Sequence, residues 1–494
     1  MLTAYQALLR HWKETVSLKQ LIGLAHWDQQ TYMPVNAARQ RADQLAVITR
    51  VIHERIDSGE FGELIARTDH ADLDRLGQIN LRLIKRERKR VAAIPADLAA
   101  AISRASSLAT QNWKQAKESE DVAAFLPFLA EVVSLKRQEA DALDEGDGRY
   151  NALFNCYEPD TDAEWVHEMF IRLRRGLTEL RDQIRCADPI EPIPTVDFPR
   201  DQQLALARQI AGKFGYDWKR GRLDLSVHPF TCGDGDDVRI TTRVDETDLL
   251  DCLFATIHET GHALYEQNIA PDLAMTPAGM ASSLGIHESQ SRFLENQIAR
   301  GASFIAWLFD CLKQELGDFG IIDAHTLYCC CNSVSDGFIR TMADEVQYNL
   351  HILLRFDLER ALVSGDLEVG DLEVAWNERF LGDFGVAVDK PSNGMLQDTH
   401  WASGSFGYFP TYTLGNIYSA CLHARLIQDL PELDRDLRRG DPTSAVAWMQ
   451  EKVHRHGASL QPLEIIQAAT GETVSEMPLL DYLRDKFGEI YGLG

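Results

Sequence analysis

The 494-residue sequence contains no long apolar run and no excess of positive charge. Its apolar stretches fall short of the roughly 20 residues that a membrane-spanning helix needs, so we expect no membrane partner. Its 75 acidic residues outnumber 50 basic ones and give a formal net charge of -25. Such a surface repels phosphate backbones and anionic lipids, so we expect no nucleic acid partner. The one basic run, Lys85–Arg90, fits the solvated face of a charged helix.

The sequence also lacks the regular cysteine spacing of metal-binding or disulfide-rich domains. The nine cysteines follow neither zinc-ribbon nor disulfide-framework spacing, and Cys329, Cys330 and Cys331 are consecutive in an apolar helical context. This usage is typical of a reducing compartment. The N-terminal stretch is amphipathic and lacks the continuous apolar segment of a signal peptide, so we expect a cytoplasmic protein.

Strand signals are nearly absent from the first 185 residues. From Leu2 to about Arg185, apolar residues recur every three or four positions with charged residues between them, which predicts long helices. Four prolines between Pro189 and Pro199 then predict an extended connection. We therefore expect a mainly α fold, a single catalytic unit of two helical halves, residues 1–188 and 189–494.

The clearest β signal lies in residues 228–244, where a Gly-Asp-Gly-Asp turn separates a short run from the alternating VRITTRV. This pattern predicts a β-hairpin. Asp245 or Thr247 can then cap a helix that begins near Asp248 and contains the stretch IHETGHALYEQ.

Two more helices are predicted around residues 283–299 and 338–365, the second ending at Gly365. Residues 389–415 are rich in Gly, Ser and aromatic residues and show no clean period. Long irregular loops in compact domains are often functional, so we expect functional residues in this segment.

The strongest chemical signal is His-Glu-x-x-His at residues 258–262. On a helix, this spacing places two imidazoles one turn apart on the same face, which is half of a catalytic zinc site. The neighbouring residues are apolar, so a buried Glu259 would be costly unless it had a role. Gly261 lowers helix propensity by about 1 kcal/mol relative to Ala, which indicates that a neighbouring backbone or ligand needs the space.

A catalytic zinc ion takes three protein ligands and a water. The next predicted helix offers two candidates, His287 and Glu288, for the third position. We favour Glu288, because two histidines and a glutamate form a familiar catalytic zinc set, and His287 is the alternative. The fourth position would hold a water whose pKa falls to about 7, and Glu259 is placed to take its proton.

Several short motifs are spread along the chain. They are HPF (His228–Phe230), DVRIT (Asp237–Thr241), HETGH (His258–His262), HESQ (His287–Gln290), IRTMAD (Ile339–Asp344) and GMLQ (Gly394–Gln397). These six occur in the order seen in the carboxypeptidase Taq family of metallocarboxypeptidases. WDQQTYMP (Trp27–Pro34) and GYFPTYTLG (Gly407–Gly415) also look like that family, so the chain resembles it over nearly its whole length.

The resemblance implies a large helical zincin-like (gluzincin) fold with a deep central groove and a small β-hairpin or sheet beside the metal site. It implies a homodimer that removes single residues from peptide C-termini with broad specificity. One zinc ion per chain is expected, and cobalt can substitute for it. Carried over by motif, His258, His262 and Glu288 are the metal ligands, and Glu259 is the general base.

A carboxypeptidase must hold a free α-carboxylate, for which the two-pronged guanidinium of arginine is a fitting partner. Arg340 and Arg239 both lie within family motifs and among apolar or β-branched neighbours, unlike a solvated surface arginine. We rank Arg340 first for the carboxylate, and we expect the other arginine to brace the site through Asp237 or Asp344. The strand Val238–Val244 either pairs with the substrate backbone or is an ordinary structural hairpin.

The tetrahedral oxyanion needs one donor besides the metal. Tyr412, His400 and Tyr408 in the aromatic segment are candidates for contacts with the substrate, and Tyr412 is preferred for the oxyanion. His228 in HPF is expected to line the groove.

Three other functions fit parts of the pattern. A zinc endo-oligopeptidase uses the same chemistry in a groove that is open at both ends. A di-iron carboxylate bundle uses Glu-x-x-His twice, and this motif recurs at Glu164–His167 and Glu451–His454, but on polar segments and with no use for His258. A helical scaffold with an unused metal site would not need Glu259, because structural zinc sites are closed.

Overall fold

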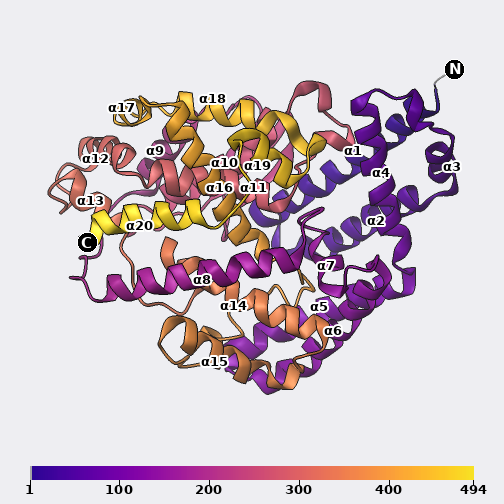
Figure 1. The fold of residues 1–494 in the computed structure, drawn as a ribbon, viewed down its shortest axis with the longest axis horizontal. Helices are drawn as coiled ribbons and strands as arrows, with labels where there is room; N and C mark the ends of the chain where they lie inside the picture. The colour runs from indigo at the N-terminus through magenta and orange to yellow at the C-terminus, as the bar shows by residue number, and fades with distance from the viewer. Residues whose placement is uncertain (1–2, 494) are drawn as a thin grey trace. The chain divides into compact units, whose positions relative to one another are not determined.

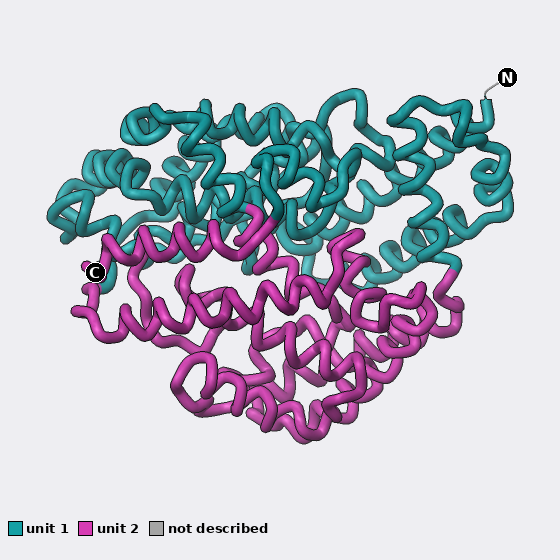
Figure 2. Tube along the Cα trace, in the orientation of Figure 1, with its two compact units in different colours: residues 1–92, 192–331, 419–473 teal, residues 93–191, 332–418, 474–494 magenta. Residues whose placement is uncertain are grey.

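The computed structural model describes residues 3–493, and over this range the protein is mainly helical with one small sheet, as predicted. No helix in the described range has the length and apolar character to cross a membrane. The chain divides into two compact units, each built from three stretches of sequence (Figure 2). The first unit comprises residues 1–92, 192–331 and 419–473, and the second comprises residues 93–191, 332–418 and 474–494. Each unit therefore takes segments from both sides of residue 188.

The first unit carries the metal motif on a central helix, α10 (Figure 1). Its α-helices are α1 (Ala4–Thr31), α2 (Ala38–Asp57), α3 (Gly59–Arg67), α4 (Arg75–Ala93), α9 (Arg200–Lys213), α10 (Asp251–Asn268), α11 (Leu284–Arg292), α12 (Ala302–Leu316), α13 (Ala324–Cys331), α17 (Leu433–Leu437), α18 (Thr443–Lys452) and α19 (Pro462–Thr470). Short turns of 3-10 helix are η1 (Val35–Ala37), η2 (His70–Asp72), η3 (Pro271–Leu273), η4 (Pro277–Gly279) and η9 (His454–Ser459), and η5 (Phe293–Ala299) is a π-helical turn.

The first helices of this unit fold around an apolar cluster of their own. Thr3 and Gln6 form a capping box at the start of α1, in which each side chain accepts a hydrogen bond from the other residue's backbone N–H. Leu8, Trp12 and Val16 follow at intervals of four and share one face of α1, which is buried against α2, α3 and α4. The predicted helical periodicity therefore corresponds to a real core.

A three-stranded sheet precedes α10. The strands are β1 (Leu223–Leu225), β2 (Thr231–Asp234) and β3 (Asp237–Thr242), in the order β1-β3-β2. β2 and β3 pair antiparallel, with Thr231 opposite Ile240, so the predicted hairpin is confirmed. β1 pairs parallel with β3 and was not predicted, because three residues are too few to show a period.

The start of α10 differs from the prediction. The helix begins at Asp251, not near Asp248, and neither Asp245 nor Thr247 caps it. Asp248 Oδ1 instead accepts hydrogen bonds from the backbone N–H groups of Leu250 and Asp251, both at 2.9 Å. Asp245 accepts from the backbone N–H and hydroxyl of Thr247 in the preceding turn. Four acidic or hydroxyl residues in succession, residues 245–248, made the capping residue ambiguous.

The described residues of the second unit form helices joined by loops and contain no strand. Its elements are α5 (Ala96–Ser119), α6 (Val122–Leu143), α7 (Arg149–Phe154), α8 (Ala163–Arg185), η6 (Arg340–Met342), α14 (Glu345–Ser364), η7 (Val369–Asp371), α15 (Leu372–Phe384), η8 (Pro391–Asn393) and α20 (Met477–Tyr491). Helix α16 (Pro410–Asp429) contains the boundary between the two units.

Helix α14 is the centre of the second unit, and it packs against α6, α7, α8 and α15 (Figure 1). It ends at Gly365, as predicted, with Gly365 in the left-handed region at φ 97°. Most of its residues are buried, including the charged Arg355 and Glu359. Charged groups are costly inside a protein unless they are paired or functional, so this helix carries more than packing.

Two predicted segments have different boundaries in the structure. The helix predicted from residue 338 begins only at Glu345, so Arg340 lies in the short turn η6 instead of on a long helix. Asp344 caps α14 by accepting the backbone N–H groups of Val346 and Gln347. The irregular segment ends at Pro410, where α16 begins, so Tyr412 lies in the first turn of a helix and not in a loop.

Candidate active site

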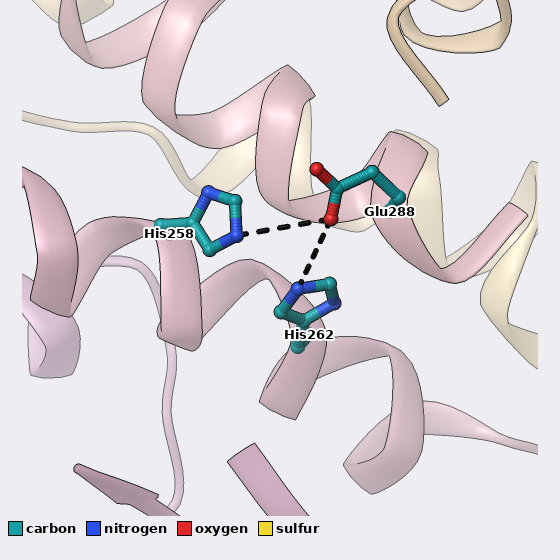
Figure 3. Close-up of side chains that lie close together, drawn as sticks. All are labelled: His258, His262 and Glu288. Atoms are coloured by element: carbon teal, nitrogen blue, oxygen red, sulfur yellow. Dashed lines mark ion pairs between the residues drawn. The ribbon is translucent and has the colours of Figure 1, made fainter. Parts of the chain in front are cut away.

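His258 and His262 project from the same face of α10, one helical turn apart, toward Glu288 on α11 (Figure 3). The Nε2 atoms of His258 and His262 lie 3.8 and 3.4 Å from Glu288 Oε2. One ligand atom from each of the three residues lies within 4.8 Å of the other two. In the described part of the chain, no other group of three such residues is close enough to hold a metal ion.

Gly261 allows α10 and α11 to approach closely enough for these residues to meet. A Cβ atom at Gly261 would lie 2.5 Å from the carbonyl oxygen of Gln290 and 2.6 Å from Cα of Ser291. Because both neighbours are backbone atoms of α11, they cannot rotate away. The expectation that a neighbouring backbone needs this space is confirmed.

Each candidate ligand is oriented by a second contact. Nδ1 of His262 lies 3.1 Å from the backbone oxygen of His287, which can only accept, so this nitrogen carries the hydrogen. Nδ1 of His258 lies 2.8 Å from Glu295 Oε2. Arg292 Nε donates to Glu288 Oε1 at 2.7 Å, which leaves Oε2 directed at the imidazoles.

This arrangement fits a divalent metal ion. With hydrogen on both Nδ1 atoms, the lone pairs of both Nε2 atoms face a carboxylate oxygen, and electron-rich atoms converge in this way around a cation. Burial lowers the pKa of His262 to about 3, which keeps it neutral. Burial alone would raise the pKa of Glu288, but Arg292 and the histidines hold it well below its ordinary value. Burial alone would lower the pKa of His258, but Glu295 and Glu288 raise it above its ordinary value, so a metal ion competes with a proton at this residue. Neutral imidazoles and an ionised carboxylate are the forms that bind metal.

His287, the alternative ligand, is directed elsewhere. Its Nε2 lies 3.0 Å from Glu266 Oε1, and its ring stacks on that of His262 with 4.5 Å between the ring centroids. It therefore packs behind His262, and its backbone oxygen orients that ligand. Adjacent residues on a helix point in different directions, so Glu288 and His287 cannot both face the imidazoles.

Glu259, the candidate base, is buried on α10 beside strand β2. The hydroxyl of Thr231 lies 2.7 Å from Glu259 Oε2 and 3.0 Å from the backbone oxygen of the same residue. Burial raises the pKa of Glu259, which makes it a better proton acceptor. Thr231 was not predicted, although it directly follows the HPF motif.

Arg239 and His228 also lie in the first unit. Arg239 donates from Nε and Nη2 to the two oxygens of Asp237 at 2.7 and 2.8 Å, and its guanidinium lies 4.3 Å from the ring centroid of Trp27. Arg239 is therefore already paired with Asp237, the bracing partner considered above. His228 is exposed, and its backbone oxygen accepts from the Ser226 hydroxyl at 2.7 Å.

In the second unit, two arginines share one carboxylate. Arg340 directs Nε and Nη2 to Asp398 Oδ1 at 3.1 and 2.9 Å, and Arg355 directs Nε to Asp398 Oδ2 at 2.7 Å. Burial alone would raise the pKa of Asp398, but Arg355 and Arg340 lower it well below its ordinary value. Burial lowers the pKa of the adjacent His400 to about 4, so His400 is neutral at pH 7. The cluster therefore carries a net positive charge that suits an anion.

Sequence reasoning missed Arg355 and Asp398. Asp398 directly follows the GMLQ motif, and Arg355 directly follows the apolar stretch Ile352–Leu354, so both had a weak signal. Neither signal indicated that the two residues meet, because 43 positions separate them.

The structure brings Arg340 together with the three predicted residues of the aromatic segment. His400 Nε2 lies 3.4 Å from the Tyr412 hydroxyl, and the Tyr408 and Tyr412 rings are 5.3 Å apart between centroids. The Arg340 guanidinium lies 5.1 Å from the Tyr412 ring centroid. Hydroxyl, imidazole and guanidinium donors are thus grouped within one unit.

Glu359 on α14 anchors the segment that carries these aromatic residues. This fully buried carboxyl accepts hydrogen bonds from Trp401 Nε1 at 3.2 Å and from the backbone N–H of Gly407 at 3.3 Å, and it also pairs with the Tyr150 hydroxyl. Gly407 has φ 86°, and a Cβ there would lie 2.8 Å from the backbone nitrogen of Phe154. The segment is therefore fixed to α7 and α14.

We predict that Glu359→Gln reduces the pH dependence of stability. Burial raises the pKa of Glu359 to about 8 from an ordinary value of 4.5. Between these values the folded state keeps a proton that the unfolded state has released, so the free energy of unfolding falls as the pH rises, by at most about 1.4 kcal/mol per pH unit. The amide cannot titrate, so urea unfolding at a series of pH values should show a smaller loss for the variant. Equal losses in both proteins would contradict the assignment.

The other two Glu-x-x-His sequences do not form a second metal site. Glu164 pairs with Arg360, and Nδ1 of His167 lies 3.7 Å from Asp357. His454 is buried with Nε2 at 2.9 Å from Gln290 Oε1. The di-iron hypothesis therefore has no support in the described residues.

A helix-borne His-Glu-x-x-His motif that faces a glutamate from the next helix, with a buried glutamate between the two histidines, defines a metallopeptidase site. The family model for carboxypeptidase Taq (M32) metallopeptidases matches residues 7–487. The chain therefore belongs to the carboxypeptidase Taq (M32) family, and it is a metallocarboxypeptidase.

Individual relatives agree with this assignment. Thermostable carboxypeptidase 1 of Thermus thermophilus is 37% identical over 505 residues, which cover 99% of both chains. Carboxypeptidase 1 of Bacillus subtilis is 35% identical over 480 residues, which cover 96% of this chain and 95% of that protein. The crystal structure of the M32 carboxypeptidase from Deinococcus radiodurans R1 has a TM-score of 0.97 at 35% identity and covers 99% of this chain and 100% of that chain. The predicted family, mainly α fold and carboxypeptidase function are confirmed.

Proposed function

We propose that the protein removes single residues from peptide C-termini with broad specificity, using one zinc ion held by His258, His262 and Glu288. The observation that carries this proposal is the convergence of Nε2, Nε2 and Oε2 of these residues within 4.8 Å. Two imidazoles and a carboxylate suit zinc in a catalytic site, and cobalt accepts the same ligands.

Glu259 is the general base in this proposal. A bound divalent ion supplies a Lewis acid that acidifies water and polarises the scissile carbonyl. Glu259 accepts the proton of the attacking water, and we assign this proton to Oε1 because Oε2 accepts the Thr231 hydroxyl at 2.7 Å. The same carboxyl then delivers the proton to the departing amine. Its buried position supports this role, because the raised pKa brings a carboxylate closer to neutral pH.

The substrate's terminal carboxylate is assigned to Arg340. Its cluster with Arg355 and Asp398 carries two cations and one anion, so a further carboxylate would balance the charge. Tyr412 is assigned to the oxyanion, with His400 as its hydrogen-bonded neighbour at 3.4 Å. Tyr408 contacts the substrate beside them.

Arg239 and His228 are assigned secondary roles in this proposal. Arg239 braces the hairpin through Asp237, and the exposed His228 contacts the peptide.

The test is mass spectrometry of an eight-residue peptide incubated with metal-stripped protein, before and after zinc or cobalt is restored. A C-terminally amidated copy of the peptide is the control. The proposal predicts a metal-dependent ladder that shortens by one residue at a time from the free C-terminus and is absent for the amide. Internal fragments would instead indicate an endo-oligopeptidase, and cleavage of the amide at the same rate would exclude a carboxylate anchor.

Arg340→Ala should weaken the recognition of free C-termini. Loss of a charged hydrogen-bonded contact costs about 1.5–3 kcal/mol, so kcat/KM for the free peptide should fall by roughly 10- to 150-fold, mainly through KM. Because Arg340 is buried against Asp398, thermal unfolding must be measured as well, and Arg340→Lys keeps the charge if the alanine variant is unstable.

The matched control for this measurement is Arg239→Ala. It removes the arginine ranked second for the carboxylate, so its kcat/KM for the free peptide should fall less than that of Arg340→Ala. A larger effect of Arg239→Ala would reverse the ranking.

We also propose a cytoplasmic homodimer. The cysteine usage supports the compartment, since its spacing is that of a thiol-containing protein and not of a disulfide framework. Helices α1 and α2 support the dimer, since they expose the large apolar side chains Leu21, Leu24, Val47 and Val51 by 37–50%. Light scattering should give a mass twice that of the 55.6 kDa chain, and a monomer mass at micromolar concentration would contradict it.

A further inference from the structure

The helix that supplies Glu288 changes its winding about one turn after this residue. α11 is α-helical to Arg292, and residues 293–299 continue it as the π-helical turn η5. The turn closes with a hydrogen bond from the backbone N–H of Arg300 to the oxygen of Glu295, five residues apart, at 2.9 Å. Such turns are rare and often occur at functional sites, so the side chains that this one positions are informative.

Glu295 is the side chain of this turn that reaches the metal ligands. Its Oε2 lies 2.8 Å from Nδ1 of His258, the ring nitrogen opposite the one that faces Glu288. The carboxyl is largely buried, with an exposed side-chain fraction of 14%. A buried carboxylate needs compensation by opposite charge.

Two arginines supply that compensation. Arg292 Nη1 lies 3.5 Å from Glu295 Oε2, while its Nε donates to Glu288. Arg300 Nη2 donates to Glu295 Oε1 at 3.3 Å, its Nη1 donates to the backbone oxygen of Cys331 at 2.8 Å, and its guanidinium lies 3.9 Å from the ring centroid of Phe254. Phe254 precedes His258 by one turn on α10. Arg300 therefore contacts both the Glu295 carboxylate and α10, the helix that carries His258.

The π-helical turn explains how Arg300 reaches Glu295. At 3.6 residues per turn, positions five apart lie about 140° apart around an α-helix, so Arg300 would point away. A turn closed by bonds between residues i and i+5 brings these positions close to the same face. Glu288, Arg292 and Glu295 already share a face at spacings of four and three, and the wider turn adds Arg300 to it.

We propose that Glu295 is a positioning residue for the metal ligand His258, and that the π-helical turn completes its charge environment by adding Arg300. A carboxylate on Nδ1 selects the tautomer with its lone pair on Nε2, fixes the ring orientation and increases the ring's basicity. Nδ1 of His262 contacts a backbone oxygen, that of His287, and not a carboxylate, so the two histidines are not equivalent. The inference rests on the ligand set of the proposed function.

The test measures metal binding without substrate. Metal-stripped Glu295→Ala, Glu295→Gln and Arg300→Gln proteins are titrated with zinc in competition with a chromophoric chelator, and with cobalt while its visible absorption is recorded. Glu87→Gln, which removes a carboxylate paired with Lys19 elsewhere in the first unit, is the matched control. Thermal unfolding of the metal-free proteins separates metal affinity from folding, and the glutamine variant is available if the alanine variant does not fold.

We expect zinc affinity to fall about 100-fold in Glu295→Ala, about 10-fold in Glu295→Gln and by up to about 10-fold in Arg300→Gln. The cobalt absorption of Glu295→Ala should also differ from that of the wild type. The control should bind zinc like the wild type. In the double variant Glu295→Ala/Arg300→Gln, the effect of Arg300→Gln should vanish, because Arg300 acts through Glu295.

Unchanged zinc affinity in Glu295→Ala would overturn the inference, and full additivity in the double variant would overturn the part played by Arg300. Peptide cleavage by the wild type is recorded in the same samples. A wild type that binds zinc but leaves no C-terminal ladder would contradict the proposed function, whereas normal cleavage together with unchanged affinity in Glu295→Ala would contradict this inference alone.

Discussion

Glu259→Gln should lower kcat by about 100- to 10,000-fold while the protein still binds its metal, because the substitution removes the proton acceptor and leaves the ligand set intact. The amide has nearly the same shape as the carboxyl, and its oxygen can still accept the Thr231 hydroxyl that now lies 2.7 Å from Oε2. The loss of charge is not expected to destabilise a site where burial already disfavours the ionised form.

The measurement for Glu259→Gln is kcat and KM on a peptide with a free C-terminus, together with the metal content of the purified protein. Asp251→Asn is the matched control, since it makes the same chemical change on α10 but at a residue paired with Arg243. Turnover at the wild-type rate with metal bound would exclude Glu259 as the base. Loss of metal together with activity would instead show that Glu259 supports the ligands.

Glu288→Ala should abolish stable metal binding. Two imidazoles remain, so affinity should fall by more than the roughly 10- to 100-fold that loss of a supporting contact costs. The substitution also removes the carboxylate that accepts the 2.7 Å hydrogen bond from Arg292, so the positive charge of Arg292 is less neutralised and opposes a cation further.

Metal content after gel filtration, and activity across a range of added zinc, measure this effect. We expect little retained zinc at micromolar concentration and partial recovery of activity only at high zinc, while Asp251→Asn retains its metal. Retention of one zinc ion per chain would require another third ligand, and His287 would then have to turn away from Glu266.

The candidate metal site was accessible from the sequence because its motif is local. In His-Glu-x-x-His, the helical repeat alone places His258 and His262 on one face, and the apolar neighbours of Glu259 indicate its burial. Gly261 indicated a close contact, and α11 provides it with backbone atoms at 2.5 and 2.6 Å from a virtual Cβ. Helix content and the hairpin followed from periodicity in the same way.

The contacts that support the candidate metal site were not accessible from the sequence. Glu295 lies seven residues beyond Glu288, and the π-helical turn that brings Arg300 to it has no period that a sequence pattern reveals. Thr231 meets Glu259 only because β2 packs on α10. Such contacts depend on how helices and strands pack against one another, and the spacing of residues in the sequence does not show this packing.

The division of the chain into compact units was equally hidden. The proline-rich stretch before Arg200 contains no helix or strand, but each unit combines three separate stretches of sequence. Within the second unit, Arg340, Arg355 and Asp398 come from a short turn, a buried helix and an irregular segment. The pairing of both arginines with Asp398 follows from the folded structure, which brings these three segments together.

The sequence by itself determined the helical architecture, the two histidines and the glutamate between them, the motif order of an M32 metallocarboxypeptidase, and a short list of arginine, tyrosine and histidine candidates. These features depend on local periodicity and on residue types with few alternative uses. The tertiary structure decided that Glu288 and not His287 faces the imidazoles, that Asp398 pairs with two arginines, and that the Glu295 carboxylate lies at Nδ1 of His258. Side-chain direction and burial set these pairings, and both arise only when helices pack against one another.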